Sequence, residues 1–170
     1  SDLQVDNIKD GSATKTLATL SSSAVTLHSD VTFPAGHVIS TQMFVGTGSN
    51  TTASWATSAS YQTTGLTTGA ISHGSGNKVL LTGRFLVNAN GGGYDKAVYV
   101  GLDGATSQTD SQIYFADSDD AQLWITIPYL HLDSPSGTST TYTAQIKATD
   151  GGNLGFNNTN SFLLVQVIQQ

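Results

Sequence analysis

Leu123-Trp124-Ile125-Thr126-Ile127-Pro128-Tyr129-Leu130 is the stretch that decides the fold. Side chains of a β-strand point alternately to its two faces. One face of this strand carries Leu123, Ile125, Ile127 and Tyr129, and the other carries Trp124, Thr126, Pro128 and Leu130. Both faces are rich in apolar groups, so both need a cover. We expect the domain's own core on one face and a second subunit on the other, with Pro128 marking an edge or a bulge.

The same period of two recurs along the rest of the chain, and no window keeps the 3.6-residue apolar period of a helix. Turn-forming clusters of Gly, Asn, Ser and Pro separate the runs. The pattern predicts strands at Val38–Thr47, Ser54–Tyr61, Lys78–Asn88, Ala97–Leu102, Gln112–Phe115, Gln122–Leu132, Thr140–Thr149, Asn153–Phe156 and Ser161–Gln169. Many short strands with regular turns indicate an all-β, antiparallel sandwich or jelly roll.

The first 36 residues have a different character from residues 37–170. They contain β-forming runs at Val5–Ile8 and Thr14–Leu20, and Phe33-Pro34-Ala35-Gly36 separates them from the body. Their large apolar side chains are too few to offset the entropy of ordering the segment alone. We expect an extended N-terminal arm with short strands, ordered by contact with its own trimer or with another protein. Its partner-binding side chains are predicted to be Val5, Ile8, Leu17 and Leu20.

Composition narrows the class of protein. Among 170 residues there are 6 Lys and Arg against 12 acids, all of them Asp, giving a net charge of −6. A nucleic-acid-binding surface needs a basic face, which argues against such a partner. The chain has no Cys. It also contains no run of 18 apolar residues, which a membrane-spanning helix would need. We expect a protein made in a cytosol that leaves the cell, if it leaves, as part of a particle.

No motif predicts a catalytic or metal site. The four His form no close ligand pair, although His131 placed on a three-fold axis would bind a metal with one ligand per chain. The acidic cluster Asp117–Asp120 lacks the pattern of a calcium loop, and Asp103, Asp110, Asp117 and Asp133 show no spacing that pairs two carboxylates for hydrolysis. We therefore expect no enzyme activity and no cofactor. Tyr94, beside three glycines, is the candidate for a glycan contact.

Several stretches, in their order along the chain, resemble a known family. They are Val31–Ile39, Ser60–Leu66 with Ile71-Ser72, Asn77–Leu81, Leu132–Pro135 with Thr140–Gln145, and the apolar strand Phe162–Ile168. Together they resemble the small β-rich knob domains of bacteriophage fibre and capsid-associated proteins. Those knobs are trimeric jelly rolls like tumour necrosis factor (TNF) and the complement C1q head. The resemblance implies a TNF- or C1q-like knob over residues 37–170, preceded by an assembly arm over residues 1–36.

The resemblance further implies a homotrimeric bacteriophage virion protein. The predicted trimer-interface side chains are Trp124, Leu130, Phe162 and Leu164. Only about 36 residues precede the knob, too few for a long shaft, so we favour a capsid decoration (cement) protein over a tail protein. Its arm is expected to bind the major capsid protein or another virion protein.

Two other functions remain open at this point. The first is a receptor-binding knob of a short tail fibre or baseplate, which would recognise a host glycan through loops such as Asn90–Asp95 and Asp117–Asp120. The second is a soluble cellular ligand of the C1q or TNF type. Copy number on the particle separates decoration from the tail: many copies over the head, or few at a tail.

Overall fold

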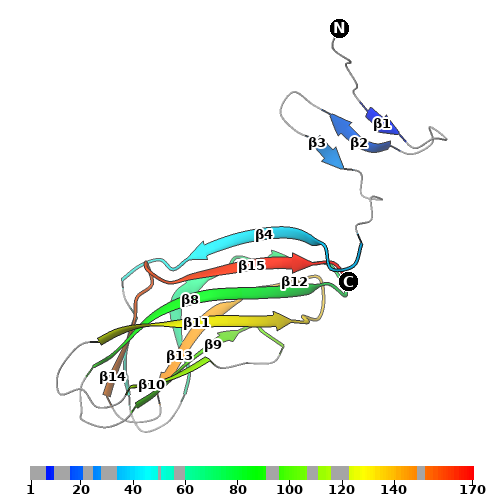
Figure 1. Ribbon diagram of the computed structural model, residues 1–170. Coiled ribbons are helices and arrows are strands. Elements are labelled where there is room, and N and C mark those ends of the chain that lie inside the picture. The colour runs from blue at the N-terminus through cyan, green and yellow to red at the C-terminus, as the bar shows by residue number, and fades with distance from the viewer. Residues whose placement is uncertain are drawn as a thin grey trace. The chain divides into compact units, whose positions relative to one another are not determined.

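A computed structural model divides the chain into two compact units, Ser1–Pro34 and Ala35–Gln170 (Figure 1). It describes residues 7–9, 16–20, 25–27, 34–49, 51–55, 60–90, 96–106, 111–115, 123–148 and 152–170. Every described strand pair is antiparallel, and the larger unit is the expected all-β jelly-roll sandwich. No helix among the described residues is long and apolar enough to cross a membrane.

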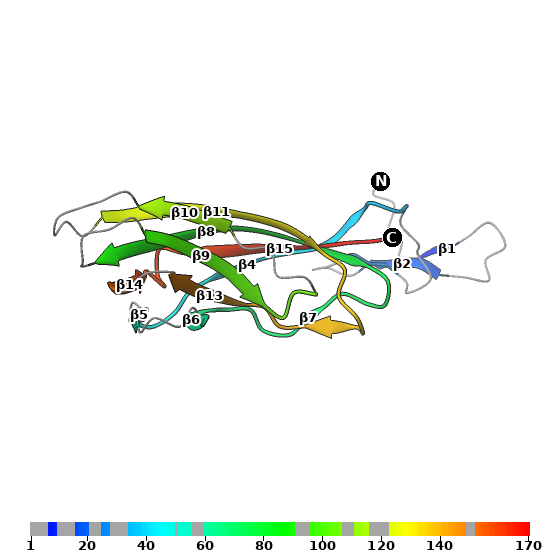
Figure 2. The ribbon, with the colours of Figure 1, turned by 90° about the horizontal axis from the view of Figure 1, so that it is seen from below.

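The larger unit contains strands β4 to β15. Their bounds are β4 Val38–Val45, β5 Thr51–Trp55, β6 Gln62–Thr67, β7 Ile71–Ser72, β8 Lys78–Asn90, β9 Lys96–Asp103, β10 Ser111–Phe115, β11 Leu123–Asp133, β12 Ser139–Thr140, β13 Thr143–Ala148, β14 Gly152–Phe156 and β15 Phe162–Ile168. They form a six-stranded sheet, a four-stranded sheet and the small β7–β12 pair (Figures 1 and 2).

The six-stranded sheet is built around the long strand β8. On one side β8 pairs along its length with β11, and on the other it pairs first with β15 and then with β14. β4 extends the sheet beyond β15, and β5 extends it beyond β14. Among the described strands β11 pairs only with β8, in a continuous register, so Pro128 marks an edge strand, one of the two predicted alternatives, and not a bulge.

The four-stranded sheet has the order β10-β9-β13-β6 and faces the large sheet across the core. One face of β8 is buried against this core and consists of Val79, Leu81, Gly83, Phe85 and Val87. At its centre the Phe85 ring lies 5.5 Å from the Tyr129 ring and 6.0 Å from the Phe156 ring, measured between centroids. Side chains of the four-stranded sheet close the core from the other side: Leu66, Val98, Val100, Leu102, Ala144 and Ile146.

Asn158, in the loop between β14 and β15, connects the loop after β4 to strand β6 beside this core. Its Nδ2 donates a hydrogen bond of 2.6 Å to the Ser49 carbonyl, and its Oδ1 accepts one of 2.9 Å from the Gly65 backbone N–H. Gly65 must lack a side chain, because a Cβ there would collide with the Thr47 carbonyl oxygen and lie 2.7 Å from Asn158 Nδ2. The Thr47 backbone N–H in turn donates to the Gly65 carbonyl at 3.1 Å.

The strand predicted at Ser54–Tyr61 is found only in part. Ser54 and Trp55 are the last residues of β5, residues 56–59 lie outside the described residues, and Ser60 and Tyr61 precede β6, which starts at Gln62. The sequence of β6 is QTTGLT, in which Thr64 takes an inward position beside Leu66. Buried Thr hides the apolar alternation from sequence analysis. The expected strand Thr140–Thr149 is likewise divided into β12 and β13, with buried Tyr142 between them.

The smaller unit is a three-stranded antiparallel sheet in the order β1-β2-β3. Its strands are β1 Asn7–Lys9, β2 Thr16–Leu20 and β3 Val25–Leu27. Short strands are thus present in the N-terminal segment, and they pair with one another. Ala18 of β2 lies opposite Ile8 on one side and Leu27 on the other, and it is buried. β3 was missed because its three residues are too few for a periodic pattern.

Candidate functional site

The outer surface of the large sheet, facing away from the core, carries apolar side chains from four strands. The strands are β4, β15, β8 and β11, which lie side by side in Figure 1. We call this surface the outer apolar face and define it by Val38, Met43, Val45, Leu80, Leu86, Trp124, Leu130, Leu132, Phe162, Leu164 and Ile168. Along each strand, its residues alternate with the buried inner residues.

Strand pairing aligns these side chains in rows across the sheet. Three rows cross all four strands, and two of them are Met43–Leu164–Thr82–Leu130 and Val45–Phe162–Arg84–Pro128. A third row is Thr41–Gln166–Leu80–Leu132. Directly opposite residues on one face lie close enough for their side chains to touch. The apolar groups are therefore contiguous across the sheet, and Thr41, Thr82, Arg84 and Gln166 interrupt them.

Several of these side chains are exposed to an unusual degree. Leu130 is 69% exposed, Met43 64%, Leu132 49% and Val45 47%. Single exposed apolar residues are ordinary, but a contiguous apolar patch marks an interaction surface. The β4–β15–β8–β11 face therefore has the properties of a surface that another molecule covers.

The outward side of the four-stranded sheet is different in kind. Its rows include Thr67–Thr143–Asp103, Thr63–Gln145–Gly101 and Lys147–Tyr99. The Lys147 Nζ lies 4.3 Å from the Tyr61 ring centroid and 4.7 Å from that of Tyr99, so its cation covers both rings. This side is polar and suited to water. Of the two sheets, the six-stranded sheet is therefore the one with an exposed apolar outer surface.

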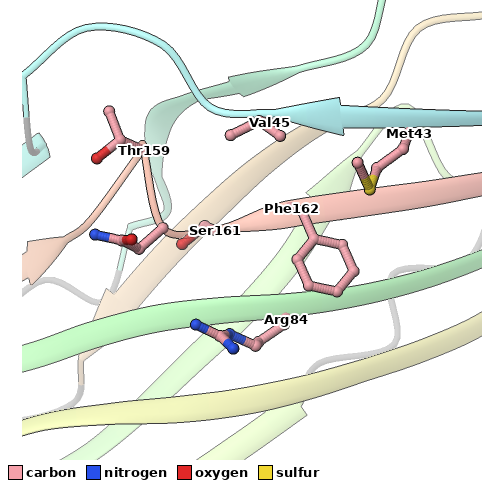
Figure 3. Close-up of a pocket in the computed structure, with 7 residues that line it drawn as sticks. Met43, Val45, Arg84, Thr159, Ser161 and Phe162 are labelled. Atoms are coloured by element: carbon pink, nitrogen blue, oxygen red, sulfur yellow. The ribbon is translucent and has the colours of Figure 1, made fainter.

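A hollow of about 250 Å³ indents the outer apolar face near the start of β15. Figure 3 shows its lining: Met43, Val45, Arg84, Thr159, Asn160, Ser161 and Phe162. The Ser161 hydroxyl is already engaged, because it accepts from the Leu86 N–H at 2.9 Å and donates to the Asn157 carbonyl at 2.6 Å. The Arg84 guanidinium, in contrast, has no ion-pair partner within the described part of the chain.

All four side chains predicted for a subunit interface lie on the outer apolar face. Leu130 and Leu164 share one row, Phe162 lies in the next, and Trp124 lies opposite Asn88 farther along β11. Sequence analysis missed Met43 and Val45, because β4 mixes apolar residues with Ser, Thr and Gln and shows no clean alternation. It also gave no role to Arg84.

The other predicted site residues are less informative. Ile8 belongs to β1, and Leu17 and Leu20 belong to β2. Val5, Tyr94 and the loop residues Asp117–Asp120 lie outside the described residues. For these positions the predicted partner and glycan contacts stay predictions.

Asp133, one of the carboxylates weighed for hydrolysis, is buried in a structural role. Its Oδ1 accepts hydrogen bonds of 2.9 Å from the backbone N–H groups of Thr106 and Ser134, and its Oδ2 accepts one of 2.9 Å from the Tyr142 hydroxyl. Burial, and then the bond to Asp133, raise the pKa of Tyr142 well above its ordinary value of 10.0. These bonds tie the end of β11 to the start of β13 and to the loop after β9.

His131 takes an inward position on β11. Its ring centroid lies 6.5 Å from that of Tyr129, and its Nε2 lies 3.9 Å from Asp133 Oδ1. If the three-fold axis passes along the outer apolar face, the prediction that His131 binds a metal on that axis is therefore wrong. Among the described residues no three His, Cys, Asp or Glu side chains come together as a metal site would require.

Comparisons with known proteins reveal only distant likenesses. The sequence matches no family model and no curated protein. A structure of the infectious bursal disease virus Gt strain shares 9% identity over 89% of this chain and 37% of that chain, with a TM-score of 0.48. The VP2 subviral particle of the same virus shares 11% over 86% and 41%, with a TM-score of 0.43. The Eiger TNF of S. frugiperda shares 8% over 76% and 92%, with a TM-score of 0.42.

This chain spans only 37% to 42% of the length of the virus chains. Likenesses at this level assign it no function. What its own residues define is an antiparallel jelly roll with one sheet face left apolar and uncovered.

Proposed function

We propose that this chain is a non-enzymatic structural protein of a bacteriophage virion, specifically a capsid decoration protein that works as a homotrimer. The jelly roll forms the knob of the trimer, and the N-terminal unit attaches it to the capsid. The protein acts mechanically, by holding neighbouring capsid subunits together. The virion role rests on the sequence resemblance to phage knob domains, and the assembly rests on the outer apolar face.

The single observation that supports assembly is the exposure of that face. Burial of apolar surface contributes about 25 cal/mol per Å², so a second copy that covers Met43, Leu130 and Leu132 gains considerable free energy. The opposite outer side, with Lys147 over two tyrosine rings, offers no comparable gain. Most homo-oligomers have closed symmetry, and a head-to-tail contact between copies closes into a ring such as a trimer when its rotation allows. The resemblance to trimeric knobs supports three copies.

The proposed partner of the N-terminal unit is the major capsid protein. Among the described strands β1 and β3 each pair only with β2, so each has one edge without a partner strand. A strand from another protein can add to such an edge, with main-chain hydrogen bonds supplying affinity and side chains setting the register. Three N-terminal units in one trimer would bind together, so each contact can be weak.

The alternative is the receptor-binding knob of a short tail fibre or baseplate, which would use the same trimer elsewhere on the particle. Gold-labelled antibody against the knob, viewed on intact particles by electron microscopy, separates the two. Decoration predicts label over the whole head shell. Label confined to the tail would replace decoration with the alternative.

Assembly is tested by charging one face at a time. Leu130→Lys puts a charge on the outer apolar face, and we expect it to dissociate the trimer into folded monomers. The matched control is Thr63→Lys, which puts the same charge on the exposed, polar side of β6. A Leu130→Lys protein that stays trimeric would remove the outer apolar face from the assembly.

A further inference from the structure

Arg84 is the only arginine of the chain, and it lies on the outer apolar face. Its exposed side chain projects from β8 between Phe162 of β15 and Pro128 of β11. Figure 3 shows the guanidinium and the Phe162 ring side by side. A charge at this place interrupts a surface that is otherwise suited to apolar contact.

The positive charge of Arg84 has no counter-ion among the described residues. Within the described residues no carboxylate forms an ion pair with it. The adjoining hollow has an apolar side made by Met43, Val45 and Phe162, with Asn160 at its rim. The Asn160 Nδ2 donates one hydrogen bond of 3.1 Å to Asn157 Oδ1, which leaves its second amide hydrogen available. The hollow is thus lined by a planar cation, an amide donor and apolar side chains.

Covering this face in an assembly changes the energetics of Arg84. A guanidinium removed from water without an anion is strongly destabilising, whereas one that meets a carboxylate in good geometry is tolerated. The flat fork of arginine fits a carboxylate through two parallel hydrogen bonds, which lysine cannot reproduce. A copy that covers the outer apolar face therefore has to bring an anion to Arg84.

The chain itself supplies anions of one kind. Its 12 acidic residues are all Asp, against 6 Lys and Arg, so a second copy carries an excess of short carboxylate side chains. We infer that the hollow is a socket for an aspartate of the neighbouring copy, and that the Arg84–aspartate pair sets the register of the subunits. This inference rests on the proposed homotrimer and adds to it the residue that specifies how the copies meet.

The test compares subunit exchange between trimers labelled with two different fluorophores. The variants are Arg84→Leu, Arg84→Glu and Arg84→Lys. Lys147→Glu is the matched control, because Lys147 is a cation on the polar outer side of the four-stranded sheet, away from the outer apolar face. Arg84 is exposed in the single chain, so circular dichroism is expected to show all variants folded. We expect Arg84→Leu to speed exchange at least about tenfold, because it strands the aspartate. Arg84→Glu is expected to speed exchange further, Arg84→Lys less, and Lys147→Glu by less than about threefold.

The aspartate that pairs with Arg84 is identified by exchanging the charges of the two residues. Arg84→Glu is combined in turn with Asp→Arg at each aspartate, and one combination is expected to return exchange to near the wild-type rate. Exchange in Arg84→Leu that equals or is slower than wild type would overturn the inference while leaving the trimer intact. A wild-type chain that is a folded monomer would instead overturn the proposed function, before any variant is compared.

Discussion

The hydroxyl of Tyr142 donates a hydrogen bond of 2.9 Å to Oδ2 of Asp133, and both side chains are buried. The tyrosine lies just before β13 of the four-stranded sheet, and the aspartate is the last residue of β11 in the six-stranded sheet. One polar contact therefore links the two layers at the edge of the core. Two backbone N–H groups complete the coordination of the carboxylate, which explains how a charge is accommodated there.

Removing the hydroxyl is expected to destabilise the sandwich. Tyr142→Phe leaves the Asp133 carboxylate short of one donor, at a cost of roughly 1–3 kcal/mol in the free energy of unfolding. Urea unfolding at a fixed protein concentration measures the change. Tyr99→Phe is the control, because Tyr99 lies on the polar outer side and no hydrogen bond of its hydroxyl occurs among the described residues. Equal, small effects of both variants would contradict the role given to this bond.

The same bond predicts a loss of stability in alkali. The pKa of Tyr142 is raised in the folded chain above its ordinary value of 10.0, so above about pH 10 the unfolded chain loses this proton first. The contribution is complete below pH 10 and decreases as the pH rises beyond it. Urea unfolding from about pH 8 to about pH 11 should show a steeper decline for wild type than for Tyr142→Phe. Parallel declines would show that the phenol titrates normally.

A methyl group at Gly65 is expected to disrupt the junction around Asn158. Its Cβ would meet the Thr47 carbonyl oxygen and the Asn158 amide, so Gly65→Ala should cost about 1–3 kcal/mol through overpacking. Gly69→Ala is the matched control, because a Cβ there meets nothing within 4 Å. Thermal unfolding of the two variants gives the comparison. A Gly65→Ala protein as stable as Gly69→Ala would mean that the loops move apart without cost.

Strands with clear alternation were predictable, and so were their faces. In β11 the two predicted faces are found: Ile127 and Tyr129 are buried in the core, and Trp124 and Leu130 lie on the outer apolar face. The strand β6 was not predictable, because its buried positions include Thr64 and its sequence has no apolar period. Propensity and period describe one strand at a time. They reveal which face is apolar but not which strands lie beside one another.

The contacts that define the site are long-range and had no local signal. Arg84 and Phe162 are far apart in the sequence and become neighbours only because β8 pairs with β15. Asp133 looked like any other acid of the chain until the fold surrounded it with donors from Thr106, Ser134 and Tyr142. Sequence analysis could name Leu130 and Leu164 as interface candidates, because each sits on a strand with two apolar faces.

Deleting Ser1–Pro34 is expected to separate assembly from attachment. The larger unit has its own core, so the shortened chain should remain a folded trimer. Without the smaller unit it should no longer bind particles. Co-sedimentation with undecorated capsids measures binding, and the full-length chain is the control. Decoration at normal occupancy by the shortened chain would move the capsid contact to the knob.

The mass of the protein in solution shows whether further copies of this chain cover the outer apolar face. Multi-angle light scattering of the full-length protein at micromolar concentration is expected to give three times the 17.7 kDa mass of the chain. Burial of the face that carries Leu130 and Met43 supplies the free energy of that association. A stable, folded species of 17.7 kDa would contradict the account, because the outer apolar face would then lie open to water.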